Sequence, residues 1–137
     1  MTDALLLTLA SVPDNVPVVR HAVRGLLDGR EVPETVTADV LLAVTEACTN
    51  VVQHAYGGRP STAGEMEVTA DWAGADELVV VVRDRGRGFA PRVDSPGLGL
   101  GLPVIAAVTR RLELRETPGG GTEVVMAFAL TPAHPAT

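Results

Sequence analysis

Residues 78–82 form a run of five aliphatic side chains, and this run most constrains how the chain can fold. A strand with one face in water alternates apolar and polar residues, so an unbroken run predicts a central strand buried on both faces. Asp84 follows the run, and Gly86 and Gly88 come next at alternate positions. Residues without side chains would let a flat ligand approach the backbone and the Asp84 carboxylate closely. The alternative is a glycine-rich turn in which Asp84 bonds its own backbone.

Length and charge limit the classes of protein to which the chain can belong. A chain of 137 residues is expected to form one domain, residues 1–137, with a sizeable core. The formal net charge of -6 disfavours direct binding to nucleic acid, which needs a basic face. All 11 Lys and Arg positions are Arg, so the lysine of a P-loop site is missing and Walker-type NTPases are excluded.

The single cysteine and the apolar segments predict a cytoplasmic protein. Cys48 has no partner for an internal disulfide, and its helical apolar surroundings indicate a buried thiol in a reducing compartment. Asp3, and no basic region, precedes the apolar run of residues 4–7. No apolar stretch is expected to reach the length of a membrane span, so we expect no membrane association.

A short strand at residues 4–10 and two amphipathic helices are predicted in the first half of the chain. The first helix should begin within residues 11–15, which offer several N-cap side chains, and end at Asp28 and Gly29. The second should run from Thr35 or Thr37 to His54, where an aromatic and glycine-rich stretch ends it.

Glu46 and Asn50 lie one turn apart on the polar side of the second predicted helix. This spacing stacks a carboxylate beside a carboxamide, and the two can hold a metal ion or a polarised hydroxyl between them. The alternative is that the pair only belongs to the solvent-exposed face of the helix.

Period-two patterns predict two hairpins and, with them, the fold class. Residues 66–72 should pair with the central strand, and residues 111–115 should pair with residues 124–130 across a glycine-rich turn. The element order is typical of an α+β fold, a two-layer α/β sandwich whose mixed, mostly antiparallel sheet carries helices on one face. Residues 132–137 have no pattern and are expected to form a loose tail.

A second glycine cluster precedes a short helix predicted at residues 104–108. Gly97, Gly99 and Gly101 alternate with leucines, and Leu102 and Pro103 follow. Free N–H groups and the positive end of the helix dipole suit a phosphate at such a helix start. Proline fits a first helical turn. Without a preceding parallel strand, the glycines are not a dinucleotide fingerprint.

Taken together, the motifs resemble the GHKL, or Bergerat-fold, ATPase superfamily, whose members carry four boxes in a fixed order. The matching positions are Glu46-Ala-Cys-Thr-Asn50 with His54 and Tyr56, then Asp84-Arg-Gly86-Arg-Gly88, then Gly97-Leu-Gly99-Leu-Gly101, then Gly121-Thr122. Their joint occurrence in this order makes the resemblance specific. It spans nearly the whole chain, and within the superfamily the chain is similar to the anti-sigma-factor serine/threonine kinases of the RsbW type.

The resemblance implies that ATP and Mg²⁺ bind, and it gives the matching residues roles. Asp84 would accept a hydrogen bond from the adenine amino group. Gly86 and Gly88 would let the ring approach, and Thr122 would support the same pocket from the adjacent strand.

At the phosphate end, the resemblance implies that Asn50 holds Mg²⁺, which normally takes only one or two protein oxygens beside phosphate and water. Glu46 would be the catalytic base that accepts the proton of the attacking hydroxyl. The remaining implied nucleotide contacts are His54, Gly97, Gly99, Gly101 and Leu102, and either Arg92 or Arg87 would add a cation at the γ-phosphate.

Two functions of different classes follow from the resemblance. The first is an ATP-dependent serine/threonine kinase that phosphorylates an anti-sigma antagonist and sequesters a sigma factor, and Glu46 favours it. The second is a nucleotide-gated anti-sigma binding module without phosphate transfer, which the short segment at residues 89–96 favours. A detached histidine-kinase-like ATPase domain is a third. By resemblance we expect a homodimer, with the leading strand or first helix at the contact.

Overall fold

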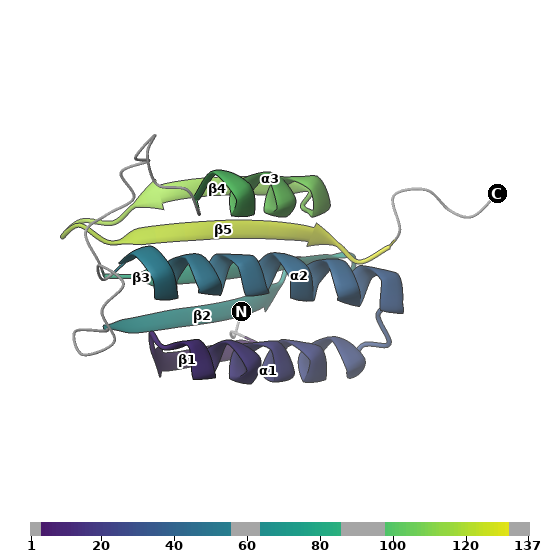
Figure 1. Ribbon diagram of the computed structural model, residues 1–137. Helices are drawn as coiled ribbons and strands as arrows, with labels where there is room; N and C mark the ends of the chain where they lie inside the picture. The colour runs from purple at the N-terminus through teal and green to yellow at the C-terminus, as the bar shows by residue number, and fades with distance from the viewer. Residues whose placement is uncertain (1–3, 56–63, 86–97, 132–137) are drawn as a thin grey trace.

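The computed structural model describes residues 4–55, 64–85 and 98–131, with the backbone alone at 54–55 and 98–100. Within these ranges the chain forms one five-stranded sheet of order β1-β2-β3-β5-β4, and three α-helices cover one of its faces (Figure 1). Every strand pairing between described residues is antiparallel. The predicted α+β two-layer sandwich is therefore confirmed. The tail predicted at residues 132–137 lies outside the described ranges.

The five strands have the bounds β1 Leu5–Ala10, β2 Glu65–Trp72, β3 Glu77–Asp84, β4 Arg111–Glu116 and β5 Thr122–Ala129. Both predicted hairpins form, β2 with β3 and β4 with β5. The β4–β5 turn contains Gly119 and Gly120 at φ 100° and 99°, a region that glycine adopts without a steric penalty. The aliphatic run belongs to β3, which lies at the centre of the sheet as predicted.

β3 is fully buried on one face only. Leu78, Val80 and Val82 point toward the helices and are buried, whereas Val79 and Val81 point to the opposite face and are half-buried. The prediction of burial on both faces is wrong because the described helices all cover the same side of the sheet (Figure 1). On the other side, neighbouring side chains of β2 and β5 give the valines partial cover.

The helices are α1 Val16–Asp28, α2 Glu34–Asn50 and α3 Leu98–Val108. A 3-10 turn, Pro13–Asn15, precedes α1, and no side chain caps the helix. Asn15, from the stretch predicted to supply the N-cap, occupies the cap position, but its side chain makes no capping bond. The Asn15 side chain instead donates from Nδ2 to the carbonyl oxygen of Ala10 at 2.8 Å, which ties the turn to the end of β1.

α2 is the central helix and lies between α1 and α3 (Figure 1). Its buried side includes Val40, Val44 and Ala47, which join the sheet residues in one hydrophobic cluster. By length and composition alone the segment Glu34–Gln53 passes for a membrane span, with mean hydropathy 1.3, so the expectation that no stretch reaches that length is wrong. Half of that stretch is buried inside the fold, as in the core helix of a globular domain.

Candidate active site

The elements that carry the predicted site residues meet at one end of the molecule. Figure 1 shows the end of α2, the end of β3, the beginning of β5 and the beginning of α3 at the same end, on the left of the view. α2 contacts β3, β5 and α3 directly. The fold therefore brings the described parts of the four sequence boxes to one end of the molecule, although other elements separate them along the chain.

Glu46 and Asn50 occupy the last turns of α2, and both are half-buried. Their spacing places them on one side of the helix, as the sequence predicted. The side toward the core carries Val44, Ala47 and Cys48, all buried. The pair does not belong to a fully exposed polar face, because α3 packs against α2. A half-buried carboxylate beside a carboxamide is suited to hold polar groups of a ligand in a defined geometry.

Gly101 of α3 makes the closest approach to this pair. A β-carbon at Gly101 would stand 3.0 Å from Asn50 Nδ2, 3.3 Å from Asn50 Oδ1 and 3.3 Å from Glu46 Oε2. Gly101 is itself buried. The missing side chain thus lets the backbone of α3 lie directly against the two polar groups, and a larger residue would push into them.

The start of α3 differs from the prediction. The helix begins at Leu98, before the predicted start at residue 104, so Gly99 and Gly101 lie inside the first turns and not in a loop ahead of the helix. Pro103 also lies inside the helix, where its ring cannot donate to the carbonyl of Gly99. Gly99 has no side chain and can adopt the backbone geometry that the proline ring requires four residues later. The low helix propensity of the two residues had instead indicated that the helix begins after them. Leu102 is half-buried and packs against the core.

α2 does not end at Asn50 in a simple cap. It continues as a π-helical turn, Val51–Ala55, which the sequence analysis did not predict. Such i→i+5 turns are rare and are frequently found at functional sites. The backbone of His54 belongs to this turn, and its side chain lies outside the described residues.

Asp84 and Thr122 form the second half of the site. They are direct cross-strand partners at the end of β3 and the start of β5. Both are on the helix-covered side, and only 8% and 4% of their surfaces are exposed. A carboxylate has two oxygens that can each accept more than one hydrogen bond, so a buried Asp84 has the chemistry to accept from a donor group of a ligand.

Gly121 has a structural role that the sequence analysis named only as part of a motif. A β-carbon at Gly121 would stand 2.1 Å from the backbone oxygen of Asp84 and 2.7 Å from Thr117 Oγ1. Any side chain would therefore force β5 away from the end of β3. The Gly121-Thr122 pair marked this position in the sequence, but the sequence could not show that Gly121 lies against the backbone of Asp84.

Several predicted site residues lie outside the described residues. They are Gly86, Gly88 and Gly97, together with the two arginines proposed for the γ-phosphate, Arg87 and Arg92. Their predicted roles remain predictions.

Among the described residues, no group of three His, Cys, Asp or Glu side chains is placed to hold a metal ion. A site for Mg²⁺ does not need such a group, because the ion keeps water and phosphate ligands and takes only one or two protein oxygens. The Asn50 carboxamide offers one such oxygen, on the side of α2 that faces Gly101.

Cys48, two residues after Glu46, is fully buried. Burial raises the pKa of its thiol to about 12 because the apolar surroundings disfavour the charged thiolate. The thiol is therefore protonated at neutral pH and is not a nucleophile. This confirms the buried thiol that the sequence predicted.

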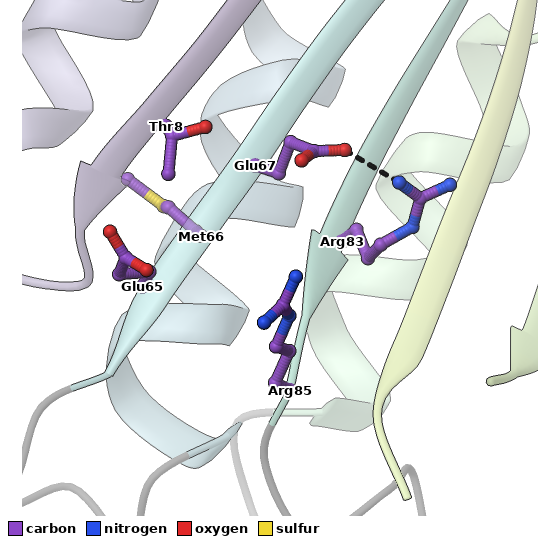
Figure 2. Close-up of a pocket in the computed structure, with 6 residues that line it drawn as sticks. All are labelled: Thr8, Glu65, Met66, Glu67, Arg83 and Arg85. Atoms are coloured by element: carbon purple, nitrogen blue, oxygen red, sulfur yellow. Dashed lines mark hydrogen bonds and ion pairs between the residues drawn. The ribbon is translucent and has the colours of Figure 1, made fainter. Parts of the chain in front are cut away.

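A small pocket lies between β1, β2 and the end of β3 and is lined by Thr8, Glu65, Met66, Glu67, Arg83 and Arg85 (Figure 2). Its volume of about 30 Å³ suits water, whereas nucleotide-sized ligands need pockets of several hundred Å³. None of the residues predicted to contact the nucleotide lines it.

Residues 9–128 match the family model described as a histidine kinase-like ATPase domain. The chain is 31% identical over 97 residues to the serine-protein kinase RsbW of Bacillus pumilus, covering 71% of this chain and 59% of that protein. It is 31% identical over 100 residues to an anti-sigma F factor of a Thermoanaerobacter species, covering 65% of this chain and 67% of that protein. The chain thus spans about three-fifths of the length of the RsbW relative.

Among solved structures, the RsbU and RsbW domains of a Mycobacterium tuberculosis protein superpose with a TM-score of 0.72 at 23% identity. The match covers 100% of this chain and 35% of that one. At this identity the likeness establishes the fold, which is that of the five-stranded sheet and helices described above. With the family model matching most of its length, the chain belongs to the histidine kinase-like ATPase domain family.

Proposed function

We propose that residues 1–137 act as one ATP-binding unit, an anti-sigma factor that is also a protein serine/threonine kinase for an anti-sigma antagonist. The observation that carries the proposal is the close approach of Gly101 to Asn50 and Glu46, whose polar atoms would stand 3.0 to 3.3 Å from a β-carbon added to the glycine. It joins the glycine-rich box to the helix that bears the two polar groups needed for phosphate transfer. Two relatives are named serine-protein kinase and anti-sigma F factor, and these names support the proposed kinase activity and the proposed binding of a sigma factor.

In this proposal the base-binding end of the site is the Asp84 and Thr122 pair. The Asp84 carboxylate accepts a hydrogen bond from the adenine amino group, and Thr122 supports it from β5. Their burial keeps competing water away, which makes a mismatch at Asp84 costly. Gly86 and Gly88 are proposed to let the adenine ring approach Asp84.

At the phosphate end, Asn50 is the proposed protein ligand of Mg²⁺. The ion, when bound, would neutralise charge on the transferring phosphoryl group. Gly97, Gly99 and Gly101 are proposed to bring backbone N–H groups close to the phosphates, and Arg87 or Arg92 would add a cation. His54 and Leu102 are further proposed contacts.

Glu46 is the proposed catalytic base. The substrate serine oxygen attacks the γ-phosphorus, and its proton passes to the Glu46 carboxylate. The bond from the γ-phosphorus to the bridging oxygen breaks, and ADP leaves. Such transfer depends mainly on positioning and charge stabilisation, so a half-buried carboxylate fixed on a helix is sufficient.

The partners in the proposal are a sigma factor and an anti-sigma antagonist protein, and the domain works as a homodimer in the cytoplasm. Light scattering tests the assembly, since the chain has a mass of 14.2 kDa. A particle of about twice that mass at micromolar concentration is expected, and a monomer at that concentration would remove the dimer from the proposal.

The experiment that tests the function is transfer of labelled γ-phosphate from ATP to an antagonist protein encoded beside this one. The unmodified protein should transfer label to a serine or threonine. Glu46→Gln should lower the transfer rate by roughly a hundredfold, the usual worth of a positioned general base, and leave ATP and sigma binding unchanged. Asp39→Asn, an exposed carboxylate earlier on the same helix, is the matched control and should transfer at the normal rate.

The outcomes separate the alternative functions. Normal transfer by Glu46→Gln would contradict the base assignment. Sigma binding without any transfer by the unmodified protein would favour the non-catalytic binding module. Transfer to a histidine of another protein would favour the detached histidine-kinase-like domain.

A further inference from the structure

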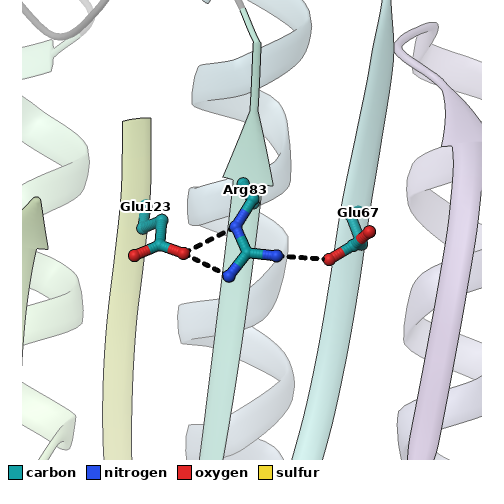
Figure 3. Close-up of polar contacts among 3 residues, drawn as sticks. All are labelled: Glu67, Arg83 and Glu123. Carbon is teal, nitrogen blue, oxygen red and sulfur yellow. Dashed lines mark hydrogen bonds and ion pairs between the residues drawn. The ribbon is translucent and has the colours of Figure 1, made fainter. Parts of the chain in front are cut away.

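Arg83 joins the three inner strands of the sheet on the face away from the helices (Figure 3). From β3, its Nε donates to Glu123 Oε2 on β5 at 2.6 Å, and its Nη1 donates to Glu67 Oε1 on β2 at 2.5 Å. Its Nη2 also forms an ion pair with Glu123. We refer to Glu67, Arg83 and Glu123 as the Arg83 clamp. A guanidinium can make this set of contacts because its planar fork carries five donors.

The clamp lies directly beside the proposed adenine site, on the other side of the same strands. Arg83 pairs with Glu123 in the strand register, and the next pair is Asp84 with Thr122. Successive side chains of a strand point to opposite faces. The clamp therefore occupies the exposed face one residue before the two buried site residues.

The position of the clamp along the strands gives it a mechanical role. Asp84 is the last residue of β3 and Thr122 is the first of β5, so their pair closes the ladder at this end. Strand ends open locally at low cost. The last position before this end is the Arg83 to Glu123 pair, and the contact to Glu67 extends the tie to β2.

The side chains of the clamp are partly exposed, so its main effect is not on the free energy of unfolding of the whole domain. The exposed fractions of the side chains of Arg83, Glu67 and Glu123 are 40%, 31% and 17%. Ion pairs at such exposure contribute little to the free energy of unfolding, because water screens them. The clamp can nonetheless affect ligand binding. The groups that bind a ligand must be kept within about 0.5 Å of the productive geometry, so a weak contact that fixes the strand ends can change the affinity.

We propose that Arg83 is a positioning residue for nucleotide recognition. By holding the ends of β2, β3 and β5 together, the clamp fixes where Asp84 and Thr122 stand relative to each other. Arg83 does not touch the nucleotide, since its side chain points to the opposite face. This inference rests on the proposed nucleotide site.

The test compares ATP affinity in Arg83→Met and Arg24→Met by calorimetry. Methionine keeps an unbranched stem and removes the guanidinium. Arg24 is the matched control, because its exposed ion pair with Glu34 joins α1 to the start of α2, at the end of that helix away from the site. We expect the dissociation constant for ATP to rise about tenfold in Arg83→Met, within the range known for small misplacements of binding groups. It should stay within about twofold of the unmodified value in Arg24→Met, whose ion pair is on the surface.

A double-mutant cycle with Asp84→Asn distinguishes positioning from a general loss of stability. If Arg83 acts by placing Asp84, its removal should weaken binding far less once Asp84 is already Asn. Arg83→Lys, which keeps the charge without the fork, should fall between the unmodified protein and Arg83→Met.

Three results would overturn the inference. One is normal ATP affinity in Arg83→Met, and another is an equal loss in both backgrounds of the cycle, which would indicate a structural role. The third is an unmodified protein that does not bind ATP. That result would overturn the proposed nucleotide site as well, and it is plainly different from an Arg83→Met protein that binds ATP normally.

Discussion

Gly101 on α3 and Asn50 on α2 are so close that a β-carbon on the glycine would stand 3.0 Å from the Asn50 amide nitrogen. Real β-carbons rarely have a neighbour this near, so a side chain at position 101 must displace the carboxamide or shift α3. The proposed Mg²⁺ ligand and the glycine-rich helix are thus coupled by contact. A change in one moves the other.

Gly101→Ala is therefore expected to lower Mg²⁺-dependent ATP affinity. Alanine favours a helix interior by about 1 kcal/mol over glycine, which should offset the contact and leave stability nearly unchanged. Gly25→Ala is the control, because it lies inside α1 with no atom within 4 Å of its added β-carbon. It should raise the melting temperature and leave ATP affinity as it was. Calorimetry with and without Mg²⁺, beside thermal unfolding, measures both effects. An unchanged Mg²⁺ dependence in Gly101→Ala would contradict the coupling.

Asp84→Asn should weaken ATP binding by about 1–3 kcal/mol, the cost of leaving a buried polar partner mismatched. The carboxamide keeps one acceptor oxygen but replaces the other with an NH2 donor and loses the charge that strengthens the bond from the adenine amino group. Asp76→Asn is a suitable control, since Asp76 is exposed at the turn before β3, at the end opposite Asp84. Calorimetry of ATP binding checks the pair. Equal affinities of Asp84→Asn and the unmodified protein would remove Asp84 from the adenine site.

Asn50→Ala should abolish phosphate transfer together with the Mg²⁺ dependence of nucleotide affinity, because it removes the proposed metal ligand. Glu46→Gln, by contrast, should keep that dependence. Gln53→Ala serves as the control, being an exposed carboxamide one turn beyond Asn50. Titration of ATP affinity against Mg²⁺ concentration is the measurement. A Mg²⁺ dependence retained in Asn50→Ala would place the metal ligand elsewhere.

Cys48 predicts a specific alkaline destabilisation. Its thiol ionises near pH 9.0 in the unfolded chain, whereas burial raises the pKa to about 12 in the folded protein. Between these values the unfolded state binds fewer protons than the folded state, so the free energy of unfolding should fall as pH rises. Denaturant unfolding across this window should show a steeper loss than in Cys48→Ala, which lacks the thiol. Equal slopes for the two proteins would show that the thiol is not buried as described.

The sequence predicted the arrangement of elements well, because the signals were local. Alternation defined β2 and the β4–β5 hairpin, and the helical spacing of apolar residues defined α1 and α2. The aliphatic run correctly placed β3 at the sheet centre. Its second covered face was a wrong prediction, since the number of layers depends on where the helices pack and not on the strand itself.

Boundaries and contacts at the site were harder to predict. Gly99 and Pro103 are poor helix formers, yet both lie inside α3, because packing against α2 outweighs propensity there. The π-helical turn after Asn50 has no simple sequence pattern. The resemblance predicted that Asp84 and Thr122 belong to the site, but their direct pairing, the close approach of Gly121 and the bridge made by Arg83 depend on strand register.

The place of β3 in the sheet has a consequence for hydrogen exchange. β3 has a bonded neighbour on each side, β2 and β5, whereas β1 and β4 are edge strands with one neighbour each. Amides of such an inner strand become accessible to solvent deuterium mainly through large openings of the fold, while edge amides exchange through local ones. Asp84 is the last residue of this strand, whose inner amides are expected to exchange slowly. The proposed adenine site stands at the end of this strand, where local opening is easiest, so its shape between rounds of nucleotide release depends on the Arg83 clamp as well as on the protected inner strand.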